Sequence, residues 1–169
     1  MKIRFLSLAL IAVLLAIGKP ATAYPTAAEL QSRIMGVHTL VSVTFVYENG
    51  TRSDPYGPSV KGQFMATKDR FSFQIMGERP KFAASNRWAG TPEENAADIR
   101  ATESIFGTYT IDAPSQSIVL HMERAIFPNW DGTDRAYVMT VNGNNLEMVG
   151  PRTPSPQGFF QPHLLWANP

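Results

Sequence analysis

The segment at residues 127–134, Phe-Pro-Asn-Trp-Asp-Gly-Thr-Asp, lies between two stretches of strand-like composition. Pro128 has no backbone N–H to donate to a sheet, and Gly132 can adopt backbone angles closed to other residues, so a strand must break here. An ordinary solvated turn carries Asn, Asp, Gly and Ser, whereas this one also carries Phe127 and Trp130. Bulky aromatic side chains on a turn pack either onto the core or at the mouth of a ligand site, so the segment indicates one of these two roles.

Residues 1–23 have the order of a secretory signal peptide. Two basic residues precede an apolar run at 5–18, and Ala-Thr-Ala at 21–23 fits the small-residue cleavage pattern. The apolar run is shorter than the roughly 20 residues that a membrane-spanning helix needs. We therefore expect cleavage after Ala23, one domain at 24–169, no stable membrane insertion after cleavage, and a secreted or periplasmic protein.

The charge and cysteine content limit the partners and the means of stabilisation. Removal of Lys2, Arg4 and Lys19 with the signal peptide changes the formal net charge from +1 to −2. A nearly neutral domain gives no electrostatic reason to expect nucleic acid as a partner. The chain has no cysteine, so its core alone must stabilise the fold without disulfides.

Short strand-forming runs alternate with turn signals through most of the domain. Phe71, Phe73 and Ile75 alternate with polar or smaller residues, which is the period of a half-buried strand. Asn49-Gly50 is a strong hairpin signal. About eight such runs favour a sandwich or an up-and-down antiparallel barrel. The expected strands are 37–47, 60–66, 70–76, 106–112, 117–125, 135–141, 145–149 and 159–166.

One helix is predicted in the middle of the chain, at about 92–104. Thr91 can cap it, Pro92 suits its first position, and Glu94 completes a capping box. Residues 24–34 read as a short helix or a docking arm.

Several segments spread over residues 36–166 carry distinctive motifs. They are Asp-Pro-Tyr-Gly-Pro-Ser-Val-Lys-Gly at 54–62, Phe-Ala-Ala-Ser at 82–85, Ala-Gly-Thr-Pro-Glu-Glu at 89–94, Phe-Gly-Thr-Tyr at 106–109, the segment at 127–134, and Leu-Trp at 165–166. Together they resemble the lipocalin-like domain family of small bacterial and fungal proteins. The resemblance implies an all-β, calycin-type antiparallel barrel and, by analogy, a small hydrophobic ligand. His38 stands where the family's opening Gly-x-Trp pattern places a Trp, so the residue that fills the barrel floor stays open.

The candidate site residues fall into two groups. Phe127, Asn129 and Trp130 either line a ligand mouth or cap the core. Tyr109 and Arg135, with Tyr137 beside them, either bind a polar ligand head or form a network at the barrel rim. A loop at 53–58, which contains Tyr56, is a possible entrance.

His121 and Glu123 form the second group, because they share one strand face opposite Ile118, Leu120 and Met122. If this pair faces inward it can orient a ligand or move a proton; if it faces outward, these are ordinary solvated side chains. No metal or cofactor is expected, because the three histidines, His38, His121 and His163, lack close ligand spacing. No oligomeric state is predicted.

Three functional interpretations follow. The first is a secreted lipocalin-like protein that binds a small hydrophobic or amphipathic molecule. The second is a small barrel enzyme of isomerase or cyclase type that uses His121 and Glu123 for acid–base chemistry. The third is an envelope interaction module. An apolar cavity favours the first, an inward His121–Glu123 pair the second, and a polar, sealed interior the third.

Overall fold

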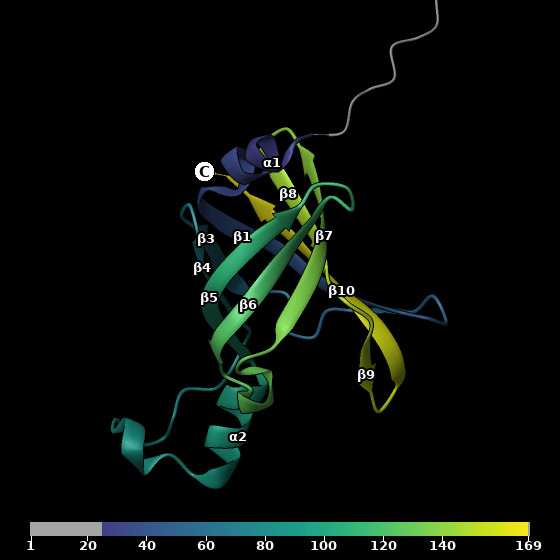
Figure 1. Cartoon of the computed structure of the whole chain (residues 1–169). Coiled ribbons are helices and arrows are strands. Elements are labelled where there is room, and N and C mark those ends of the chain that lie inside the picture. Colours follow the sequence, from purple (N-terminus) through teal and green to yellow (C-terminus); the bar gives the residue numbers. More distant parts are fainter. Residues whose placement is uncertain (1–24, 169) are drawn as a thin grey trace, which may run out of the picture.

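The computed structural model describes residues 25–168 (Figure 1), so the expected signal peptide lies outside the described residues. The elements follow in this order: α1 (Ala27–Ile34), β1 (Gly36–Tyr47), β2 (Arg52–Ser53), β3 (Lys61–Ala66), β4 (Arg70–Met76), the 3₁₀ helix η1 (Arg87–Ala89), α2 (Pro92–Arg100), β5 (Thr102–Asp112), β6 (Ser117–Ala125), the 3₁₀ helix η2 (Pro128–Trp130), β7 (Asp134–Asn142), β8 (Asn145–Val149), β9 (Thr153–Ser155) and β10 (Gly158–Ala167).

Eight of these strands form a closed antiparallel barrel, as the sequence predicts. The order around the barrel is β1-β3-β4-β5-β6-β7-β8-β10, and β10 pairs back onto β1 from Thr39↔Ala167 to Tyr47↔Phe160. The short strands β2 and β9 extend the wall beside β1 and β10. Closure pairs the edges that an open sheet would expose, so the barrel can enclose a core without a free edge.

Alternation along the strands decides which side chains fill the interior. On β6, Ile118, Leu120 and Met122 are buried, while His121 and Glu123 lie on the opposite face. The same alternation buries large apolar side chains on each of the remaining barrel strands, so a single hydrophobic core runs through the barrel.

Helix α1 covers one end of the barrel, which we call the closed end (Figure 1). Thr26 and Glu29 form a capping box at its start, and two residues of the helix, Leu30 and Ile34, are buried. The carbonyl of Ile34 accepts a hydrogen bond of 2.9 Å from Nε2 of buried His38, which ties the helix to β1.

The floor of the barrel is filled by a tryptophan from the last strand. Trp166 on β10 is fully buried, and its ring packs against Phe64 and Phe73 at centroid distances of 6.0 and 5.5 Å. The His38 ring also packs against Phe64, at a centroid distance of 5.9 Å. The side chain missing from the first strand is therefore supplied across the β1–β10 seam, where Trp166 lies opposite Leu40.

Helix α2 begins as predicted but ends earlier. Thr91 and Glu94 form the expected capping box, whereas the helix ends at Arg100 and not near residue 104. Strand β5 then begins at Thr102, four residues before the predicted start, because residues 102–108 pair with β4. Long-range strand pairing outweighs the local helical tendency of this segment. No residue of α2 is buried, and the helix lies at the end of the barrel away from α1 (Figure 1).

Candidate ligand-binding site at the open end of the barrel

A cavity enters the barrel from the end opposite α1, which we call the open end. The space available to the centres of water molecules is about 50 Å³, and the space between atoms, including the mouth, is about 400 Å³. Such a volume holds a few water molecules in the interior or a small ligand that extends into the mouth. The lining residues are Val43, Phe45, Tyr56, Phe73, Ile75, Glu103, Trp130, Arg135, Tyr137, Thr153, Phe160, Pro162 and Leu164.

The wall on the β1–β10 side is aromatic and apolar. The rings of Phe45 and Phe160 stack at a centroid distance of 3.9 Å, and Tyr56 meets Phe45 edge-on at 6.5 Å. Phe45 comes from β1, Phe160 from β10, and Tyr56 from the loop that follows β2. This wall suits the apolar body of a ligand.

Arg135 on β7 supplies a positive charge to the cavity. Its guanidinium lies over the ring of Trp130 at 4.3 Å from the centroid, and its Nη2 donates a hydrogen bond of 3.1 Å to Thr153 Oγ1. Its Nε is buried and has no hydrogen-bond partner among the residues that the structure describes. Trp130 and Thr153 therefore hold the Arg135 side chain in place, while its Nε–H makes no hydrogen bond to residues 25–168.

Glu103 places a carboxyl group in the same cavity. Tyr56 OH donates a hydrogen bond of 3.2 Å to Glu103 Oε2. Burial raises the pKa of Glu103 to about 7, although the Tyr56 hydrogen bond and the charge of Arg135 both lower it. Burial likewise raises the pKa of Tyr56 and of Tyr137, so both phenols stay neutral. The cavity thus holds a permanent cation beside a carboxyl group whose pKa is raised towards neutrality by burial.

The segment at 127–134 positions Trp130, and local hydrogen bonds fix it. Asp131 Oδ1 accepts a hydrogen bond of 2.8 Å from the backbone N–H of Ala125, and the N–H of Gly132 donates to the Met122 carbonyl at 2.8 Å. Gly132 has a φ of +71°, which other residues rarely adopt. The loop therefore folds back against β6 and holds Trp130 over Arg135.

Only some of the residues predicted at the ligand mouth line the cavity. Trp130 and Arg135 line the cavity. Phe127 is 49% exposed and packs edge-on against Trp130 at 5.5 Å, so it supports that ring from outside. Asn129 is exposed and is not among the lining residues.

Tyr109 lies at the closed end and not beside Arg135. Its hydroxyl donates a hydrogen bond of 2.6 Å to the Thr67 carbonyl and lies 3.4 Å from the side-chain amide of Gln31 on α1. The strand register still brings Tyr109 and Arg135 level through Leu120 of β6, but Tyr109 is not among the residues that line the cavity.

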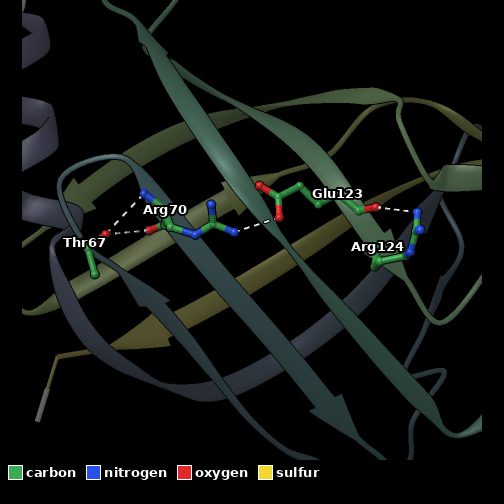
Figure 2. A network of polar contacts seen from close by, with 4 residues as sticks. All are labelled: Thr67, Arg70, Glu123 and Arg124. Carbon is green, nitrogen blue, oxygen red and sulfur yellow. Dashed lines mark hydrogen bonds and ion pairs between the residues drawn. The ribbon is translucent and has the colours of Figure 1, made fainter.

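His121 and Glu123 share a face, as predicted, and that face is the outer one. Figure 2 shows Glu123 beside Arg70 on β4, whose Nη2 donates to Glu123 Oε2 at 2.7 Å. His121 Nδ1 lies 2.8 Å from Asp134 Oδ1, and its Nε2 lies 3.1 Å from Thr110 Oγ1. Arg70 lowers the pKa of Glu123 through this hydrogen bond. Glu123 thus forms an ion pair with Arg70, and His121 contacts Asp134 and Thr110, all outside the barrel wall.

The other two histidines lie apart. His163 lies opposite Thr44 and contacts Glu147 at 3.2 Å, whereas His38 is buried under α1. Among residues 25–168, no group of three or more acidic or histidine side chains could hold a metal ion.

Sequence reasoning missed Glu103 and Thr153. Glu103 was assigned to the end of the helix, which hid its place in the strand alternation Glu103, Ile105, Gly107. Once β5 is extended to Thr102, the alternation places the Glu103 carboxyl on the inward face at the end of the strand. Thr153 follows a proline-rich loop, and no local pattern in that loop predicts its contact with Arg135.

Comparison with known families agrees with this architecture. A model of the lipocalin-like domain matches residues 35–167, which include all the barrel strands. No significant match was found among curated proteins or solved structures. Within the described part of the chain, every helix is too short or too polar to cross a membrane. The match covers most of the chain, and the chain belongs to the lipocalin-like domain family.

Proposed function

We propose that this protein binds a small molecule with an apolar body and a polar head in the open end of the barrel. The observation that carries the proposal is the convergence of Arg135, Glu103 and Tyr56 on a cavity whose other walls are aromatic and aliphatic. A few polar groups in an apolar concave site fix the orientation of a ligand, while the apolar walls supply most of the affinity.

The size of the cavity restricts the ligand. The interior space of about 50 Å³ is far below that of a large lipid site, so a bound molecule must be short or must extend through the mouth beside Trp130. The apolar walls and the open mouth favour this interpretation over the interaction module, for which a sealed polar interior is the expected sign. The acid–base role of His121 and Glu123 is not part of the proposal, because neither lines the cavity.

Export to the periplasm or the medium belongs to the same proposal and is supported by the composition of residues 1–23. Mass measurement of the protein from the envelope fraction tests it. A mature chain that begins near Tyr24 is expected, and a full-length chain retained in the membrane contradicts it.

Tryptophan fluorescence tests the binding itself. Trp130 lies at the cavity, whereas Trp88 is 87% exposed and Trp166 is fully buried at the other end. A panel of amphipathic molecules of increasing length should quench the wild-type emission and raise the melting temperature. Trp130→Phe should remove most of the quenching and leave the emission of Trp88 and Trp166. If no member of the panel changes either signal, the binding proposal is wrong.

A further inference from the structure

Among the polar groups that line the cavity, one buried hydrogen-bond donor has no partner within residues 25–168. The Thr153 hydroxyl accepts from Arg135 and donates to the Pro151 carbonyl at 2.9 Å, so its proton is already used. Tyr56 donates to Glu103. Arg135 Nε–H is buried and has no acceptor among residues 25–168. A buried donor without a partner costs free energy, so the hydrogen-bonding capacity of Arg135 is not fully used within the protein.

The charges of the cavity also favour an acceptor that is negative. The guanidinium of Arg135 stays charged at every physiological pH. The charged and titratable groups that face Glu103 are Tyr56 from the loop after β2 and Arg135 and Tyr137 from β7. The residue that pairs with Glu103 on the adjacent strand β4 is the apolar Ile75. Because burial raises the pKa of Glu103 to about 7, this carboxyl only partly neutralises Arg135 at neutral pH.

We propose that the ligand is a small carboxylate with an apolar tail, whose head group binds the guanidinium of Arg135 beside Glu103. This inference rests on the proposed binding function. Arg135 lines the cavity, and Trp130 covers one face of its guanidinium, while the apolar rings of Phe45 and Phe160 are available to the tail. The protonated Glu103 adds a second donor, whereas its ionised form repels the ligand.

Calorimetric titration with three probes of equal tail length tests the inference. Octanoate should bind at least about tenfold more tightly than 1-octanol at pH 6, because hydrogen bonds to charged groups contribute more than neutral ones. Octylamine should bind most weakly of the three. Arg135→Met keeps an unbranched apolar side chain, and it should weaken octanoate at least about tenfold while 1-octanol changes little.

Arg124→Met is the matched control. Arg124 lies on the same barrel wall, but it is exposed and pairs with Asp131 at 3.3 Å outside the cavity. Its replacement should leave the affinity for octanoate unchanged. If Arg124→Met weakens octanoate as much as Arg135→Met does, general surface charge explains the preference and the inference is wrong.

The pH dependence of the unmodified protein provides a test that needs no change at Arg135. Octanoate stays ionised from pH 6 to 8, so the protonation of Glu103 decides the trend, and affinity should fall about tenfold over this range. Glu103→Gln should abolish this fall. Equal affinities for octanoate and 1-octanol, or a preference for octylamine, overturn the carboxylate inference but leave the binding function standing. If none of the three probes binds, the inference is wrong, and the wider panel described above decides the binding function separately.

Discussion

The two ends of the barrel are built by the same strands and differ in the side chains that occupy their interior. At the closed end, α1, Trp166 and His38 fill the interior, and Tyr109 is hydrogen bonded to a backbone carbonyl. At the open end, Arg135 and Glu103 share a cavity. Each end has a buried N–H without a partner among residues 25–168, Trp166 Nε1 at the closed end and Arg135 Nε at the open end. The comparison indicates that stability is concentrated at the closed end and ligand chemistry at the open end.

The largest expected effect comes from the two tryptophans at opposite ends. Trp166→Ala should lower the free energy of unfolding by about 3–5 kcal/mol, because it leaves a cavity among Phe64, Phe73 and their neighbours. Trp130→Ala should cost only about 1 kcal/mol, since that ring is half-buried and loses mainly its contacts with Arg135 and Phe127. Urea denaturation of both variants measures the difference. Equal losses would contradict the division of roles between the two ends.

Glu103→Gln should stabilise the protein at pH 8 by up to roughly 3 kcal/mol. The folded protein holds a proton on Glu103 that the unfolded chain releases, because burial raises the folded pKa to about 7 from 4.5. Wild-type stability therefore falls as pH rises from about 4.5 to 7, whereas glutamine does not titrate. Denaturation midpoints at pH 5 and pH 8 measure the effect.

Glu123→Gln is the control for that pH profile. Arg70 lowers the pKa of Glu123, so its carboxylate is ionised in both folded and unfolded chains above pH 5. Any change that this variant makes should be constant from pH 5 to pH 8. If Glu103→Gln gives the same flat difference, the cavity does not hold its carboxyl group protonated.

The two helices extend the comparison with a smaller effect. Thr26→Ala should cost about 1 kcal/mol, because it removes the cap of α1, which buries Leu30 and Ile34 in the core. Thr91→Ala removes the equivalent cap of α2, which buries no residue, so that helix can open without the barrel. We expect faster hydrogen exchange in α2 and a smaller change in global stability. A larger global loss in Thr91→Ala than in Thr26→Ala would show that α2 supports the barrel.

Local pattern was sufficient to predict most of the barrel. Strands such as 70–76, 117–125 and 145–149 have the bounds expected from sequence, because alternation and turn residues act over a few positions. The same alternation separated His121 and Glu123 from Ile118, Leu120 and Met122. Because Ile118, Leu120 and Met122 are buried in the core, the face that carries His121 and Glu123 is the outer one.

The site was harder to predict because long-range contacts create it. Trp130 and Arg135 were identified from an unusual aromatic turn and its flank, and both line the cavity. Glu103 was hidden by a helix that ends four residues early, because pairing with β4 overrides local propensity there. Thr153 meets Arg135 only through the loop that leads into β9. No periodicity within either segment specifies these contacts.

The smallest expected effect comes from the outer face of β6. The double change His121→Ala with Glu123→Gln should leave octanoate affinity unchanged, because the barrel wall separates these side chains from the cavity. The Glu123–Arg70 pair is solvent-exposed, so its contribution to stability should be the least of those above and should shrink further in high salt. It should also vanish as pH falls below about 4.5, because protonation of Glu123 removes the charge that Arg70 favours. Titration of octanoate into the double variant, beside Arg135→Met, separates the two faces of one wall. A loss of affinity in the double variant that matches the loss in Arg135→Met would place the ligand on the outer face and reverse the assignment of the site.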